Sequence, residues 1–150
     1  MSEWDSWVAF IQGHAVNEYL TNAPAESPAN WHIHIGGHDG SMYAKSEGFD
    51  AAFDAGEMMK LSNAANGDQT DIFSAPPAGY TILRVVPASS DFNVLTGKKK
   101  GEGGKLLYCA RCTTTFVVAL IDVTNCSRGA ESKAMDAFSV GITEGINAGI

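Results

Sequence analysis

The sequence has few basic residues, few cysteines and no long apolar run. Its 150 residues include 10 Lys and Arg against 17 Asp and Glu, which gives a net charge of −7. Proteins that bind nucleic acid over much of their surface need a basic face, so this composition argues against that class. Three cysteines, an odd number, indicate a reducing compartment rather than a disulfide scaffold.

The sequence is expected to hold neither a transmembrane span nor a secretory signal peptide. No apolar run approaches the roughly 20 residues that cross a bilayer. The first ten residues, MSEWDSWVAF, carry acids where a signal peptide carries basic residues. We therefore expect a soluble, cytosolic protein. With 45% apolar residues, the chain is expected to form a single domain over residues 1–150 with a sizeable core.

Three segments have helical periodicity. The first begins with Trp4, Trp7, Val8 and Ile11, spaced i, i+3, i+4, i+7, and Gly13 is expected to weaken it. The others are Phe49 to Ala65 and Glu131 to Ile150. The last carries a stripe of small residues, Ala137, Gly141, Gly145 and Gly149. Because each helical glycine costs roughly 1 kcal/mol, this helix is expected to press closely against another element.

Strand patterns fill most of the remaining chain. Trp31, Ile33 and Ile35 alternate with histidines, and the HDG turn that follows predicts an antiparallel return over 41–45. Further strands are expected at 80–86, 92–96, 106–111 and 114–123. The last is a continuous apolar run, typical of a central strand. Residues 21–30 are expected to form a loop. The order of elements predicts an α+β fold with a central antiparallel sheet and the terminal helices on one face.

The segment TGKKKGEGGKLL, residues 96–107, concentrates positive charge on an acidic protein. With Arg111, its lysines supply half of the ten Lys and Arg, which suggests a contact with a specific partner. The glycine spacing fits neither a P-loop nor a dinucleotide fingerprint, and strand patterns flank the segment on both sides. An ATP cradle is therefore disfavoured. The residues alone leave open a solvated hairpin tip or a binding surface.

Three segments together resemble the profilin family. SEWDSWV resembles its N-terminus, where two aromatics lie three residues apart. HDGSMYAKSEGF resembles the hairpin that leads to an aromatic, Ala, a polar residue and Ser. VLTGKKKGEGG followed by TTFVVALIDV resembles its lysine-glycine hairpin and central strand. These matches occur in the family's order and nearly span the chain.

The resemblance implies an actin-monomer-binding protein that is not an enzyme, regulates actin polymerisation and nucleotide exchange, and is associated with the cytoskeleton. In profilins this hairpin lies at the edge of the actin-facing surface, which combines the strands over 92–123 with the start of the last helix. Lysines there suit the acidic barbed-end rim of actin. The candidate actin-binding residues are Lys98, Lys99, Lys100, Lys105, Tyr108, Arg111, Arg128 and Lys133.

The resemblance also implies two further ligands. Proline-rich proteins such as formins dock on aromatic grooves, and the matching positions are Trp4, Trp7, Tyr43, Glu144 and Ile150. Profilins usually carry aromatics or His at the last two positions, so this groove is expected to be altered. Anionic phosphoinositides at the membrane surface are the second ligand, attracted by the hairpin lysines.

Other motifs favour ordinary structural roles. Cys109 and Cys112 lack further zinc ligands at suitable spacing and are expected to point to opposite faces of a strand. Trp31 is expected in the core, and the histidines at 32 and 34 are interpreted as structural rather than metal-binding. No catalytic constellation stands out, and no cofactor is expected. The alternative function is a longin- or roadblock-like scaffold that regulates small GTPases or trafficking.

Overall fold

The computed structural model of the chain describes residues 3–23, 31–49, 53–66, 77–126 and 129–150. Helix α1 spans Glu3–Asn22, α2 spans Ala55–Ala65 and α3 spans Ala130–Ala148. The strands are β1 (Trp31–Gly36), β2 (Met42–Lys45), β3 (Tyr80–Pro87), β4 (Asn93–Lys99), β5 (Glu102–Arg111) and β6 (Phe116–Asp122), and a short 3-10 helix (Pro77–Gly79) precedes β3.

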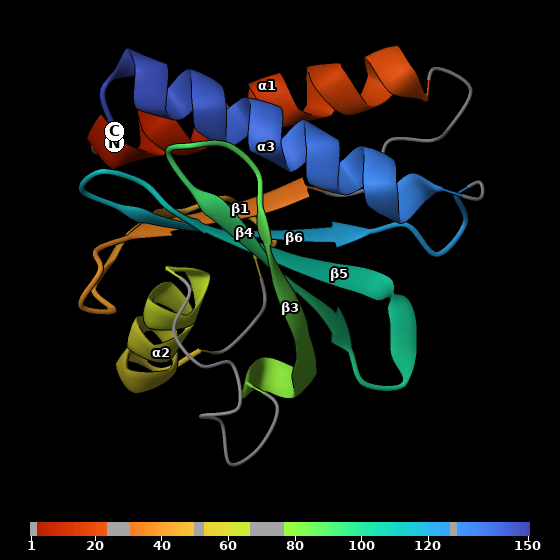
Figure 1. The fold of residues 1–150 in the computed structure, drawn as a ribbon, viewed down its shortest axis with the longest axis horizontal. Helices are drawn as coiled ribbons and strands as arrows, with labels where there is room; N and C mark the ends of the chain where they lie inside the picture. The colour runs from red at the N-terminus through yellow and green to blue at the C-terminus, as the bar shows by residue number, and fades with distance from the viewer. Residues whose placement is uncertain (1–2, 24–30, 50–52, 67–76, 127–128) are drawn as a thin grey trace.

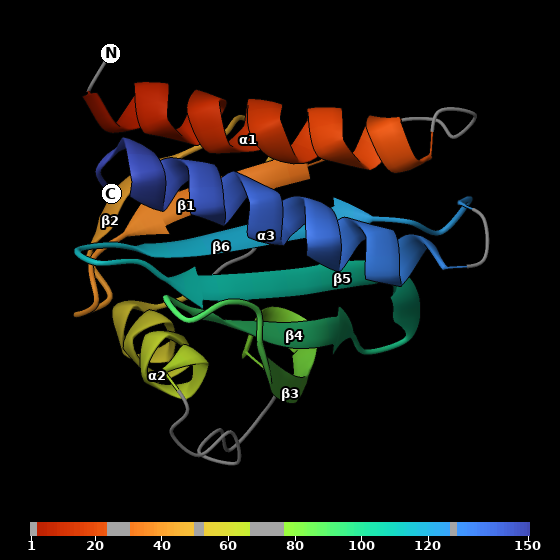
Figure 2. The ribbon, with the colours of Figure 1, turned by 45° about the horizontal axis from the view of Figure 1, so that its top comes forward.

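The strands form one antiparallel sheet in the order β2-β1-β6-β5-β4-β3. Figures 1 and 2 show α1 and α3 side by side on one face of this sheet, with α2 on the other. The prediction of an α+β fold with both terminal helices on one face is confirmed. The further helix covers the opposite face.

The longest apolar run of the sequence forms β6, which lies at the centre of the sheet and is covered on both faces. Val117, Ala119 and Ile121 join the core under α1 and α3. The alternate residues Phe116 and Val118 join the core under α2. Successive side chains of a strand point to opposite faces, so a strand covered on both faces is apolar throughout.

The small-residue stripe of α3 packs against α1, as its glycines indicate. A Cβ atom added to Gly141 would lie 3.1 Å from the carbonyl oxygen of Ile11. Helix α1 continues through Gly13. Its buried residues, Val8, Ile11, Ala15 and Tyr19, recur on one face, and their tertiary packing outweighs the roughly 1 kcal/mol cost of one glycine.

Several element boundaries differ from the predictions. Helix α2 starts at Ala55 rather than Phe49, because Asp54 accepts a hydrogen bond from the Glu57 backbone in a capping box. Helix α3 ends before Gly149, whose φ is +122°. Strands β4 and β5 extend into the lysine segment, which leaves a two-residue turn with φ of +79° at Gly101.

Part of what the sequence predicts falls outside the described residues. The expected loop over 21–30 is described only as far as residue 23. Of the segments that precede and follow α2, residues 50–52 and 67–76 lie outside, and so does Arg128. None of the described helices has both the length and the apolar character that a membrane span requires.

Candidate functional site

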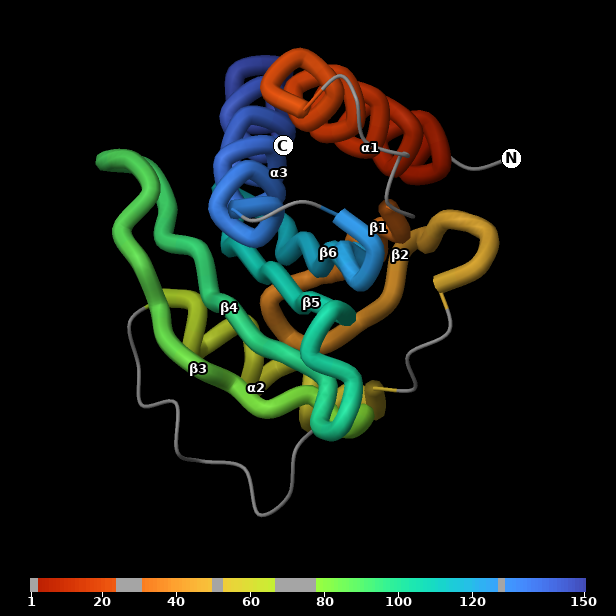
Figure 3. The backbone as a smooth tube through the Cα atoms, turned by 90° about the vertical axis from the view of Figure 1, so that its right-hand side faces the viewer, coloured from red at the N-terminus to blue at the C-terminus, as the bar shows by residue number. Residues whose placement is uncertain are grey.

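A cavity of about 710 Å³ lies between the sheet and the first half of α3. Figure 3, an end view of the sheet, shows why: α1 and α3 lie above β1, β6 and β5, and β4 and β3 extend beyond α3. On the face that carries α1 and α3, β3 and β4 therefore extend beyond the described helices, whereas α2 contacts β4 on the opposite face. The residues that shape the cavity include Leu83, Arg84, Thr96, Lys98, Leu106, Tyr108, Cys126, Glu131, Ser132 and Met135.

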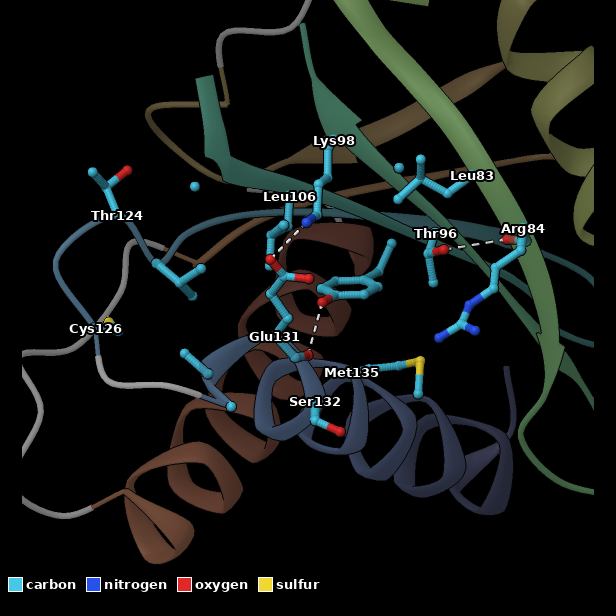
Figure 4. A pocket seen from close by; sticks show the side chains of 16 residues that line it. Leu83, Arg84, Thr96, Lys98, Leu106, Thr124, Cys126, Glu131, Ser132 and Met135 are labelled. Carbon is cyan, nitrogen blue, oxygen red and sulfur yellow. Dashed lines mark hydrogen bonds and ion pairs between the residues drawn. The ribbon is translucent and has the colours of Figure 1, made fainter. Parts of the chain in front are cut away.

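An ion pair joins the two walls of this cavity (Figure 4). The Nζ atom of Lys98 on β4 lies 2.8 Å from a carboxylate oxygen of Glu131 in the first turn of α3. Both side chains are partly exposed, 37% for Lys98 and 50% for Glu131. The pair is therefore open to solvent, salt and any partner that enters the cavity.

Tyr108 fixes the floor of the cavity to α3. Its hydroxyl donates a hydrogen bond of 3.0 Å to the backbone carbonyl of Glu131, and its ring stacks on the buried ring of Phe138 with centroids 5.9 Å apart. Burial, and then the charges of Glu131 and Asp136, raise the pKa of Tyr108. The hydroxyl stays protonated and continues to donate at physiological pH.

Arg84 also lines this cavity, and it is not among the binding residues that the sequence predicts. Figure 4 shows its side chain projecting from β3 toward α3, on the side of Met135. The Thr96 hydroxyl donates to its backbone carbonyl at 3.4 Å, and no ion pair of its guanidinium is found among the described residues. A charge in the middle of the apolar strand pattern YTILRVV is the signal that marks it.

The lysines of residues 96–107 do not form one patch. Lys98 shares the cavity with Leu106 of the core under α1 and α3. Lys99 and Lys105 line a smaller pocket of about 150 Å³ with Tyr80 and other residues of the opposite face. Neighbouring residues of a strand point to opposite faces, and both strands extend into this segment.

Glu102 pairs with both lysines of the second face. Its carboxylate oxygens lie 3.4 Å from Lys99 Nζ and 3.3 Å from Lys105 Nζ. The hydrogen bond and charge of Lys105, and then those of Lys99, lower the pKa of Glu102. Lys100 is exposed at the turn, so the four lysines occupy three distinct surroundings.

The remaining cationic candidates lie apart from Lys98. Arg111 is at the far end of β5, about 20 Å along the strand from Lys105, where its Nη2 donates to His38 Nδ1 at 3.1 Å. His38 Nε2 in turn lies 3.1 and 3.0 Å from the carbonyl oxygens of Cys112 and Thr115, so Nε2 carries the proton. Lys133 is half-buried on α3 and does not line the cavity.

The predicted proline-binding residues gather only in part. The rings of Trp4 and Tyr43 pair with centroids 4.9 Å apart, and Tyr43 is 40% exposed. Trp7 is half-buried, contacts Phe10, and makes no ring pair with Trp4 within the part of the chain described. Glu144 is partly exposed on α3.

The last residue turns back into the core. Ile150 is 2% exposed, and its backbone carbonyl accepts hydrogen bonds from the amide and hydroxyl of Thr114. Its side chain packs against α3 at Gly145, where an added Cβ would lie 3.2 Å from Ile150 Cδ1. This side chain supports the helix and presents no surface to a ligand.

The cysteines and Trp31 lie where the sequence predicts. Cys109 joins the core under α2 and Cys112 the core under the terminal helices, on opposite faces of the sheet. Burial raises the pKa of Cys109, and raises that of Cys112 to about 11. Both thiols stay protonated and unreactive at neutral pH. Trp31 is 3% exposed.

His34 is a buried histidine whose Nε2 has no hydrogen-bond partner among the described atoms. Its ring lies against Phe49, with centroids 5.4 Å apart. Burial, and then the charge of Lys45, lower the pKa of His34 to about 4. Within the described part of the chain, no group of three or more His, Cys, Asp or Glu side chains is arranged to hold a metal ion.

The low pKa of His34 predicts loss of stability in acid. An unfolded histidine titrates near 6.5, so the neutral His34 stabilises the fold above that pH, and the contribution is lost as pH falls toward 4. We expect this residue to lower the free energy of unfolding by about 2 kcal/mol between pH 7 and pH 5. Urea titrations of the wild type and His34→Phe measure it, and equal pH dependence in both would contradict the assignment.

Comparison with protein-family models and with curated proteins gives no match. Solved structures of profilins from Acanthamoeba castellanii do match. Profilin II is 24% identical with a TM-score of 0.57, and the match covers 90% of this chain and 96% of that one. Profilin IB is 21% identical with a TM-score of 0.55, over 93% and 99% of the two chains. Profilin IA is 22% identical with a TM-score of 0.52, over 93% and 98%.

The fold is thus of the α+β class: one antiparallel sheet has the two terminal helices on one face and a third helix on the other. Within that class it is a profilin-like fold, as the agreement over almost the whole length of three solved profilins shows.

Proposed function

We propose that this protein binds monomeric actin through the cavity beside α3, and so regulates actin polymerisation and nucleotide exchange in the cytoplasm. The observation that carries the proposal is the cavity itself. The profilin resemblance implies an actin-facing surface on the strands over 92–123 and the start of the last helix. The cavity lies over the same elements and holds Lys98, Tyr108 and Arg84.

Polymerisation of pyrene-labelled actin tests this function. A protein that sequesters monomers slows the fluorescence rise in proportion to its concentration. Exchange of a fluorescent nucleotide from monomeric actin provides a second readout of the same contact. If the folded protein changes neither rate at excess concentration, the proposed function is wrong.

A second ligand class, proline-rich protein segments, is proposed for the Trp4–Tyr43 pair. A partly exposed pair of aromatic rings suits the stiff polyproline helix, which loses little entropy on docking. The expected affinity is weak, because Ile150 is buried and because Glu144 is a charged residue at a position where profilins usually carry an aromatic or His. Tryptophan fluorescence during titration with a proline decamer measures it. Tyr43→Ala should abolish the change, and a response that survives this substitution would place the peptide elsewhere.

Phosphoinositide headgroups are the third proposed ligand, attracted by Lys100 and the lysines beside it. This attraction acts on a hairpin whose neighbouring lysines are already paired with Glu102 and Glu131. Co-sedimentation with phosphoinositide vesicles, compared with neutral vesicles, tests it. Equal recovery with both kinds of vesicle would count against lipid binding.

A further inference from the structure

The lysine that faces the cavity, Lys98, is already paired with a carboxylate of the protein itself, that of Glu131. Glu131 lies in the first turn of α3, where the positive end of the helix dipole favours a carboxylate. The hydrogen bond from Tyr108 to its carbonyl holds that turn against the sheet. The helix end and the tyrosine therefore hold the Glu131 carboxylate where it pairs with Lys98.

We propose that Glu131 is an internal competitor for the acidic group that Lys98 binds on a partner. The identity of that partner as actin rests on the proposed function. A partner carboxylate reaches Lys98 only by displacing Glu131 from a contact of 2.8 Å. Because half-exposed ion pairs contribute only about 0.2–1 kcal/mol, such an exchange is energetically accessible.

The other charges around the cavity support this exchange. Arg84 on the β3 wall makes no ion pair with any described residue and is available to the incoming acidic surface. Once displaced, Glu131 stays on the same wall, and like charges that face each other weaken association. Glu131 therefore lowers the affinity twice, through occupation of Lys98 and through repulsion of the partner.

Glu102 is a matched control on the same hairpin. It also pairs with lysines, Lys99 and Lys105, and its side chain is 50% exposed, as is that of Glu131. Those lysines lie on the opposite face of the sheet, in the smaller pocket. Glu102→Gln removes the same charge from the protein without changing the cavity.

The test measures the affinity for monomeric actin of the wild type, Glu131→Gln and Glu102→Gln by isothermal titration calorimetry. We expect Glu131→Gln to bind about three- to ten-fold tighter, and Glu102→Gln to stay within about two-fold of the wild type. In a Lys98→Met background, Glu131→Gln should give a smaller gain, because only the repulsion between Glu131 and the partner is then relieved. Circular dichroism melts confirm that each variant is folded.

The outcomes separate the two proposals. If the wild type binds actin and Glu131→Gln binds equally or more weakly, the competitor role is wrong and the actin site stands. A gain of the same size without Lys98, or one matched by Glu102→Gln, would reflect charge alone and would also overturn the competitor role. If none of the folded proteins binds actin, the proposed function fails, and the competitor role for this partner fails with it.

Discussion

Replacing Lys98 by Glu is expected to weaken binding to monomeric actin by about 30-fold or more. The reversal converts the ion pair with Glu131 into a repulsion across the cavity. It also places a second carboxylate where an acidic partner surface approaches. Like charges brought together at an interface cost several kcal/mol, and about 2 kcal/mol corresponds to about 30-fold in affinity. Sequestration of pyrene-actin, titrated with each protein, gives the dissociation constants.

Lys99→Glu is the matched control for this experiment. The two lysines are neighbours on β4, but Lys99 pairs with Glu102 on the opposite face of the sheet. Its reversal changes the net charge by the same amount and is expected to alter actin affinity less than about three-fold. Equal losses in both variants would mean that the hairpin acts through its total charge, and that the cavity is not the contact.

The second large effect is expected at the contact between α1 and α3. Gly141→Leu should lower the free energy of unfolding by about 3 kcal/mol, because overpacking of a close contact forces backbone shifts. Even one added carbon at this position would lie 3.1 Å from the Ile11 carbonyl oxygen and 3.5 Å from Ala15 Cβ. Urea denaturation followed by tryptophan fluorescence measures the change.

Gly13→Ala on α1 should have the opposite effect. Gly13 is exposed and lies mid-helix, and a Cβ added there would meet nothing within 4 Å. Alanine is the better helix former, so this variant is expected to gain up to about 1 kcal/mol. If both glycine variants lose stability equally, close packing is not the reason for the glycines of α3.

The sheet could be predicted from the sequence because local periodicity fixes it. The alternation around Ile33 and the two-sided apolar run from Phe116 to Asp122 each define a strand and the faces it buries. The small-residue stripe of the last segment likewise indicates the close helix contact, because glycine destabilises a helix and is favoured at Gly141 only where a neighbouring backbone approaches closely.

The candidate site was harder to predict, because it depends on strand ends and on distant contacts. The sequence pattern places the lysines together in one loop, but β4 continues to Lys99 and separates them onto two faces. Glu131 is far from Lys98 along the chain, and no local pattern links the two. Arg84 was missed for the same reason, because it lies on β3 and reaches the cavity beside residues of α3 that are far from it along the chain.

The methionine methyl groups offer the most direct test of the actin-binding surface. Met135 lines the cavity, Met59 is 43% exposed on α2, and Met42 is 58% exposed beside Tyr43. In a protein with ¹³C-labelled methionine methyls, the NMR signal of Met135 is predicted to shift or broaden on addition of monomeric actin, while those of Met59 and Met42 stay in place. A response at Met59 or Met42 without one at Met135 would contradict the proposal that the cavity beside α3 binds actin.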